Sequence, residues 1–173
     1  ITIATYETML GDRTPIIRAM PNTPAAIGRG ITAIVGNAHA SGPMLDLADA
    51  LLSAIGQVVR LEGEHQMSAV TAISGCGPAY VFHLIEAMAA AGVGAGLAPD
   101  LAMKLAKATV GGAGALAEEA AEDPATLRQN VTSPNGVTYE ALQVLMNDTD
   151  GFPPLLVRAV EAAVKRDQEL SNG

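Results

Sequence analysis

The spacing of apolar residues along the chain changes near residue 61. Before this point, short apolar runs at residues 15–20, 31–36 and 57–61 predict three strands, because runs of about four to eight apolar residues bounded by turn residues are typical of buried strands. The stretch 41–54, between the second and third runs, has helical spacing. Strand, helix and strand in so short a span predict a βαβ unit, the building block of a mostly parallel sheet.

Residues 62–173 show helical spacing and no further strand signal. We expect helices over the following stretches: 64–73, 79–91, from Pro99 onward, 124–130, from Val137 onward, and 153–170. Residues 74–78 predict a tight turn. The glycines at 111, 112 and 114 interrupt the pattern of the helix that Pro99 opens, and a close helix–helix contact is expected to offset their cost. The pattern therefore predicts the end part of an α/β domain at residues 1–61 and an all-helical domain at residues 62–173.

A polar turn runs directly into the helix expected from Val137. Thr132 and Ser133 are candidate N-caps, and Pro134 suits the first helical position. Gly136 would let a ligand approach the backbone, because it has no side chain in the way. The start of such a helix presents free N–H groups and a partial positive charge, which suit a small carboxylate. A helix that merely caps itself is the alternative, since capping explains every residue here.

Composition narrows the classes of partner. The net charge of −8 excludes nucleic acid, because no basic stripe could neutralise phosphates. No run of about 18 apolar residues lacks a Gly, a Pro or a charge, so no membrane span is expected. The single cysteine, Cys76, indicates a reducing compartment, and we expect a cytoplasmic protein. With 3% aromatic residues the helical domain would have a thin core, which predicts a homodimer with interleaved helices.

Several other motifs carry little chemistry. The glycines at 92, 94 and 96 follow a helix instead of a strand, so they do not form a dinucleotide-binding fingerprint. Cys76 is expected to be a small buried thiol. A nucleophilic role is not expected, because no cation or histidine is near it in the sequence to activate the thiol. The three histidines, at 39, 65 and 83, lack metal-ligand spacing, so no metal is expected. Asn22 and Thr23 are more suggestive, because ligands of open α/β sheets gather at the carboxyl ends of strands.

Three motifs together carry a resemblance to a known family. They are Met-Pro-Asn-Thr-Pro at residues 20–24, Ser-Gly-Cys-Gly-Pro-Ala-Tyr at 74–80, and Asn-Val-Thr-Ser-Pro-Asn-Gly-Val-Thr at 130–138. In this order and at these spacings, they resemble pyrroline-5-carboxylate reductase along the whole chain. The resemblance implies the remnant of an α/β Rossmann domain followed by an all-α dimerisation domain, a helical fold like the C-terminal domain of 6-phosphogluconate dehydrogenase. It also implies a homodimer, with dimers often assembled into decamers.

The resemblance implies an activity and a substrate site. Members of the family reduce the cyclic imine 1-pyrroline-5-carboxylate to L-proline, the last step of proline biosynthesis, with NADPH or NADH. By similarity, the substrate carboxylate would lie on the backbone N–H groups near Gly136, Val137 and Thr138. The Thr138 hydroxyl would face the imine nitrogen, and Ser133 would line the same pocket.

The resemblance also implies cofactor contacts. Asn130 and Glu64 would contact the cofactor, and the turn that contains Met20, Pro21 and Asn22 would flank the nicotinamide. The ribose-reading residues of the family are missing from the sequence, so the choice between NADPH and NADH stays open.

One departure from the family pattern affects these expectations. The glycine-rich dinucleotide loop of the family lies upstream of anything in this sequence, which is similar to the family without the first half or more of its Rossmann domain, about 100 residues. We therefore expect the 173-residue chain to be an incomplete part of the enzyme, inactive alone. Calorimetry should find no tight NADPH binding to it, and low-micromolar binding would contradict this.

Two alternatives from other classes remain. One is a non-catalytic dimerisation module. The other is the helical domain of a related hydroxyacid dehydrogenase, which would need a catalytic lysine near the nicotinamide. The lysines at 104, 107 and 165 lie in no glycine-rich or polar motif.

Overall fold

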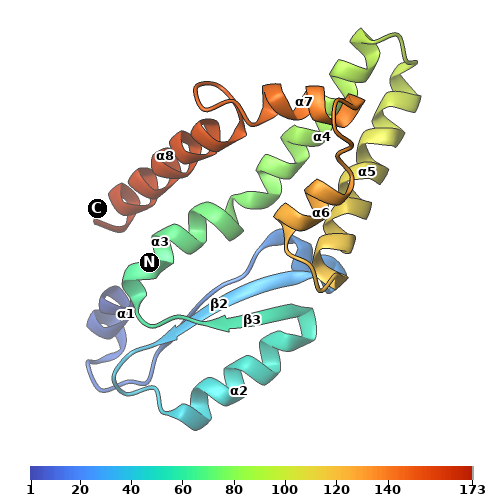
Figure 1. Cartoon of the computed structure of the whole chain (residues 1–173). Helices are drawn as coiled ribbons and strands as arrows, with labels where there is room; N and C mark the ends of the chain where they lie inside the picture. The colour runs from blue at the N-terminus through green and yellow to red at the C-terminus, as the bar shows by residue number, and fades with distance from the viewer. Residues whose placement is uncertain (173) are drawn as a thin grey trace. The chain divides into compact units, whose positions relative to one another are not determined.

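The computed structural model describes residues 1–172 and shows a small three-stranded sheet with helices, followed by a series of helices (Figure 1). The expected fold class, part of an α/β domain followed by helices, is confirmed. The chain forms two compact units. Unit 1 contains residues 1–78 together with the chain from Ala159 onward, and unit 2 is Ala79–Arg158.

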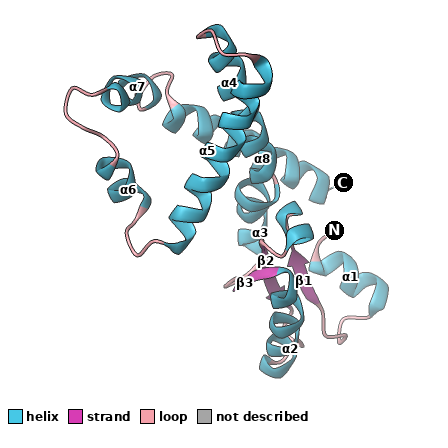
Figure 2. Cartoon of the chain, turned by 90° about the vertical axis from the view of Figure 1, so that its right-hand side faces the viewer, coloured by secondary structure: helices cyan, strands magenta, loops and turns pink. Residues whose placement is uncertain are grey.

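The sheet of unit 1 has the order β1-β2-β3 and is mixed (magenta in Figure 2). β2 (Gly30–Gly36) pairs in parallel with β3 (Gly56–Arg60), and the crossover between them contains α2 (Gly42–Leu52). The predicted βαβ unit is therefore present. β1 (Ile17–Met20), in contrast, pairs antiparallel with β2. The segment that joins β1 to β2 holds a short 3-10 turn and is too short for a parallel crossover, which needs about a dozen residues or more.

The core of unit 1 lies where the sheet meets two short helical segments. α1 (Ile3–Leu10) contributes Ile3, and α3 (Met67–Val70), which follows a 3-10 turn at Glu64–Gln66, contributes Met67. These side chains form one buried cluster with Ile16 and Val35, and Met20 and Leu61 pack against it. This cluster fixes the end of β1 against α3.

The chain does not form the tight turn expected at residues 74–78. It continues from α3 through a π-helical turn, Thr71–Gly75, in which the N–H of Cys76 donates to the carbonyl of Thr71 over 2.8 Å. α4 (Gly77–Gly94) follows directly. Pro78 is tolerated because it is the second residue of α4, where its missing N–H has no helical acceptor. The prediction of a turn was wrong because Gly and Pro also fit a helix start.

Unit 2 consists of α4, three further helices and the first part of α8 (Phe152–Asn172). The three are α5 (Pro99–Glu119), α6 (Pro124–Asn130) and α7 (Val137–Leu145). The core between α4 and α5 is made of small side chains: Ala89, Ala102 and Ala106 are buried, with Ile85 and Met103 packed against them. Small residues allow the two helices to approach closely.

The glycines of α5 do not interrupt it. Gly111, Gly112 and Gly114 all lie inside the helix, and apart from their chain neighbours and the helix's own backbone, no atom of the described chain lies within 4 Å of where a Cβ would stand on any of them. Each costs about 1 kcal/mol relative to Ala, and the close contact expected to offset that cost is not supplied by this copy of the chain. The helix therefore runs through these glycines, and no other part of the described chain covers the surface around them.

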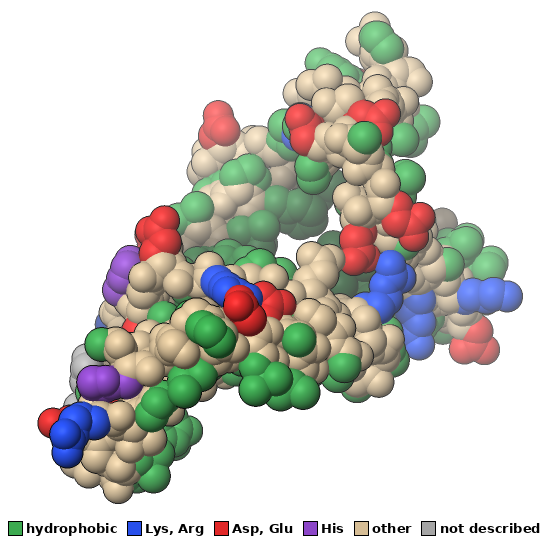
Figure 3. Space-filling model, turned by 90° about the horizontal axis from the view of Figure 1, so that it is seen from below, with side chains coloured by type: hydrophobic (Ala, Val, Ile, Leu, Met, Phe, Trp, Pro, Cys, Tyr) green, Lys and Arg blue, Asp and Glu red, His purple; other side chains and the backbone are tan. Residues whose placement is uncertain are grey.

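Many large apolar side chains are exposed, and part of this apolar surface is visible in Figure 3. By length and composition alone, the helical run Glu64–Gly94 is apolar enough to cross a membrane, with a mean hydropathy of 1.3 over 18 residues. Sequence analysis missed this run because it required a stretch without Gly or Pro. Helices that are buried in protein interiors pass the same test. Another protein surface could therefore cover the apolar residues of Glu64–Gly94 as a membrane would.

Candidate functional site

The turn before α7 decides where that helix begins. The carbonyl of Ser133 accepts from the N–H of Gly136 at 3.0 Å, and Asn135 has a positive φ of 57°. Pro134 and Asn135 are thus the central residues of the turn, an order that suits a type II turn with its positive φ at the third position. Gly136 is the N-cap residue, and no side chain caps the helix there.

The predicted N-caps were therefore wrong. The Thr132 hydroxyl donates back to the carbonyl of Arg128 at 2.6 Å and so finishes α6 instead of starting α7. Ser133 uses its backbone carbonyl in the turn. Pro134 lies before the helix and not at its first position. Thr132 thus closes α6, and Ser133 closes the turn that follows. Neither hydroxyl caps the start of α7, which stays open.

The open start of α7 presents backbone donors to the outside. The first helical hydrogen bond runs from the N–H of Glu140 to the carbonyl of Gly136, at 3.2 Å. The N–H groups of Val137, Thr138 and Tyr139 precede this bond, and Val137 is 91% exposed. Thr138 is also exposed. An anion placed here would meet free donors and the positive end of the helix dipole.

α6 is anchored at both ends, and this places Asn130 at the edge of the same turn. Asp123 caps the start of α6 by accepting from the N–H of Thr126 at 2.8 Å, and this hydrogen bond lowers the pKa of the Asp123 carboxyl. Arg128 donates from Nη1 to the sulfur of Met146, one residue beyond α7. Asn130 is the exposed last residue of α6. Five predicted site residues thus lie within one short stretch of unit 2: Asn130, Ser133, Gly136, Val137 and Thr138.

The other predicted site residues belong to unit 1. Met20 ends β1, and Asn22 accepts from the N–H of Ile31 through Oδ1 at 3.0 Å. This bond fastens the turn after β1 to the start of β2. Pro21 lies between them, and Asn22 keeps its side-chain amide as a hydrogen-bond donor. A strand end that offers an amide donor fits the carboxamide of a nicotinamide.

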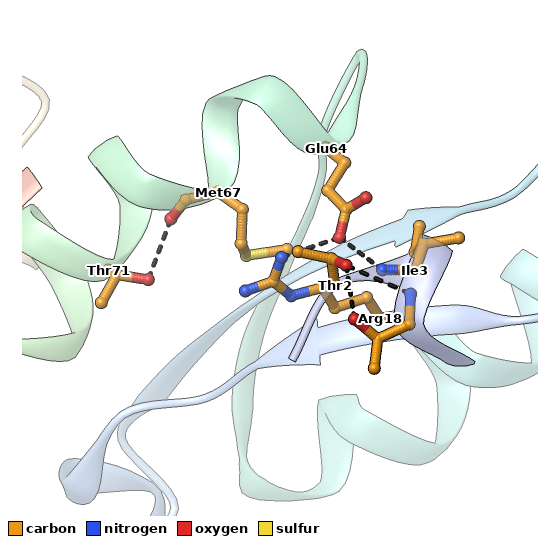
Figure 4. Close-up of polar contacts among 7 residues, drawn as sticks. Thr2, Ile3, Arg18, Glu64, Met67 and Thr71 are labelled. Atoms are coloured by element: carbon orange, nitrogen blue, oxygen red, sulfur yellow. Dashed lines mark hydrogen bonds and ion pairs between the residues drawn. The ribbon is translucent and has the colours of Figure 1, made fainter. Parts of the chain in front are cut away.

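Glu64 lies in a partly buried ion pair that sequence analysis did not find (Figure 4). Its Oε1 accepts from Nη1 of Arg18 at 2.7 Å and from the N–H of Ile3 at 2.8 Å. The side chains of Arg18 and Glu64 are 15% and 29% exposed. The pair joins β1, α1 and the first residue of the 3-10 turn, so Glu64 has a structural role in unit 1. Arg18 had no local signal, because the two residues are 46 positions apart.

Among residues 1–172, no three His, Cys, Asp or Glu side chains lie close enough together to hold a metal ion. The predicted site residues offer backbone donors, hydroxyls, amides and the carboxylate of Glu64.

The small α/β sheet and the series of helices that follows it define the class: part of an α/β protein with an all-helical domain. The profile of a family described as "Pyrroline-5-carboxylate reductase dimerisation" matches residues 64–170. The chain belongs to the pyrroline-5-carboxylate reductase family.

Curated relatives and solved structures agree. The chain is 48% identical over 155 residues to a pyrroline-5-carboxylate reductase of a Synechocystis strain, covering 90% of this chain and 57% of the relative. It is 42% identical over 171 residues to one of Pseudomonas aeruginosa, covering 99% and 62%. The Coxiella burnetii reductase structure matches with a TM-score of 0.92 at 37% identity, covering 98% of this chain and 62% of that one. A Plasmodium falciparum reductase, solved with NADP bound, matches with a TM-score of 0.84 at 31% identity, covering 96% and 66%.

The chain thus spans about three fifths of the length of these two curated relatives.

Proposed function

We propose that the chain is part of an enzyme that reduces 1-pyrroline-5-carboxylate to L-proline by hydride transfer from NADPH or NADH. Membership of the reductase family supports the reaction, and the NADP-bound relative supports the cofactor. The observation that carries the proposal is the uncapped start of α7, which offers a carboxylate the donors that it needs. We place the domain boundary after residue 61, close to the start of the family match.

In this proposal the substrate is held by its acid group. The N–H groups of Val137 and Thr138 line the approach to its carboxylate next to Gly136, whose own N–H donates to the carbonyl of Ser133. Ser133 borders the same pocket. The Thr138 hydroxyl hydrogen-bonds the ring nitrogen, first as imine and then as the product amine. Such a reaction depends on orientation more than on a strong acid or base, because a protonated imine is already electrophilic.

The cofactor, when bound, supplies the hydride. Met20, Pro21 and Asn22 would hold its nicotinamide end, with Asn130 and Glu64 as further contacts. The Asn22 amide orients the carboxamide of the nicotinamide, and the apolar side chain of Met20 excludes water. The Oε1 of Glu64 already accepts hydrogen bonds from Arg18 and Ile3, so its other oxygen, Oε2, would make the proposed contact with the cofactor.

We further propose that the protein is a cytoplasmic homodimer and that dimers assemble into decamers. The exposed leucines of α5 support the dimer: Leu101, Leu105 and Leu116 are 46%, 48% and 57% exposed. Together with Gly112 they fall on one stripe of the helix, at helical spacing. The bare glycines of α5 would let a partner helix approach closely.

Titration of the chain with L-proline tests the carboxylate site. We expect the backbone amide signals of Val137, Thr138 and Tyr139 to shift most in ¹⁵N NMR spectra, because these N–H groups precede the first helical bond. Pyrrolidine, the same ring without the carboxyl group, is the control and should shift none of them. If proline shifted only other amides, or none, a helix that merely caps itself would be the better interpretation.

A further inference from the structure

Gly75 lies directly against Met20. A Cβ built on Gly75 would stand 2.7 Å from Cε of Met20 and 3.7 Å from Cγ2 of Thr71. Carbon atoms in contact keep about 3.5–4.0 Å. The terminal methyl group of Met20 therefore occupies the space that any side chain at position 75 would need.

The π-helical turn places Gly75 at this point. The hydrogen bond from Cys76 to Thr71 spans five residues and widens the helix by one residue. The hydroxyl of Thr71 donates to the carbonyl of Met67 at 2.9 Å, which ties the turn to α3 (Figure 4). Met67 is 1% exposed and belongs to the cluster on which Met20 packs. Met20 thus packs against that cluster, and the flexible end of its side chain lies against Gly75.

Met20 is also the last residue before the turn that the proposed function assigns to the nicotinamide. Its backbone pairs with Ala33 in the sheet, and Asn22 fastens the far side of the turn to Ile31. The position and direction of this turn therefore depend on its attachments. Two of them belong to the sheet, and another is the contact of the Met20 side chain with Gly75.

We propose that Gly75 is a positioning residue for the cofactor. By leaving room for the methyl group of Met20, it sets the conformation of residues 20–22 and hence the affinity for the nicotinamide end of NADPH. This inference rests on the proposed function, and it assigns a role to the glycine motif that the proposed mechanism leaves unused.

Two matched glycine substitutions in the full-length protein test the proposal. Gly75→Ala should raise KM for NADPH about tenfold, because a displaced Met20 disturbs the turn that orients the cofactor. Its thermal midpoint should stay within a few degrees of wild type, because the displaced atom is the free end of a flexible side chain. Gly77→Ala is the control: it makes the same exchange two residues away, where a new Cβ would meet no atom of the described residues within 4 Å beyond its chain neighbours and its own helix backbone. Gly77→Ala should change neither KM for NADPH nor the thermal midpoint.

A second variant isolates the contact itself. Met20→Val removes the methyl group that the new Cβ would meet, so adding Gly75→Ala to Met20→Val should change KM for NADPH no further. With methionine methyl groups labelled with ¹³C, the Met20 signal should shift in Gly75→Ala and stay in place in Gly77→Ala.

The outcomes separate this inference from the function on which it rests. An active wild type whose KM for NADPH is the same in Gly75→Ala would overturn the inference alone, as would equal effects of the two alanine variants. An equal effect of Gly75→Ala with and without the Met20 methyl group would also overturn it. A wild type that neither binds NADPH nor reduces the imine would remove the proposed function and this inference together.

Discussion

Replacing Thr138 by Ala in the full-length protein should lower kcat/KM for 1-pyrroline-5-carboxylate about a hundredfold, the usual cost of losing one preorganised hydrogen-bond partner of a reacting group. The loss should appear mainly in kcat, since the hydroxyl acts on the nitrogen whose bonding changes during the reaction. Steady-state assays with saturating NADPH measure it directly. The backbone N–H of residue 138 remains in the variant, so the carboxylate site stays intact.

Thr138→Ser is the matched control, because it keeps the hydroxyl and removes one methyl group. It should retain most of the wild-type activity. Thr138 is exposed in the first turn of α7, so neither variant is expected to disturb the fold. If turnover and substrate affinity in Thr138→Ala both equalled those of wild type, the role assigned to the hydroxyl would be wrong.

Replacing Leu105 by Glu should weaken dimerisation at least about a hundredfold, because a carboxylate would be buried in an apolar interface without a partner. Leu105 lies near the middle of the apolar stripe of α5. Substitutions near the centre of an interface have the largest effects on affinity. Sedimentation at micromolar concentration should show a dimer for wild type and a monomer for the variant.

Lys107→Gln is the control for charge. It lowers the net charge by one, as Leu105→Glu does, but Lys107 lies on the other side of α5 from the leucine stripe. This variant should stay dimeric. A dimeric Leu105→Glu variant, or a wild type that is a stable folded monomer, would show that this stripe is not the dimer contact.

Elements whose spacing is regular were predictable from the sequence. The three strands, α2 and α6 lie where the apolar pattern predicted them, within one or two residues. The apolar residues of these elements repeat over a few positions, and Pro, Gly or a capping residue marks the ends of the elements. Residues close together in the sequence are therefore sufficient to predict them. The antiparallel pairing of β1 was not predicted, because it depends on the length of a connection and not on the apolar pattern.

The residues of the candidate site stay a prediction, and the local geometry around them could not be predicted from the sequence. Two adjacent hydroxyls, Thr132 and Ser133, both satisfied the capping rule, and nothing local could show that Thr132 closes the preceding helix instead. The open start at Gly136 follows from the turn at Pro134 and Asn135. The contact of Gly75 with Met20 joins residues 55 positions apart, which periodicity cannot detect.

The exposed glycines of α5 have a thermodynamic consequence. A 21-residue helix with three flexible positions and no neighbour around them is weak on its own, so whatever surface covers it contributes to its folding. If that surface is a second copy, folding and association are a single equilibrium governed by mass action. The temperature at which half of the molecules unfold is then set by their concentration as well as by their sequence.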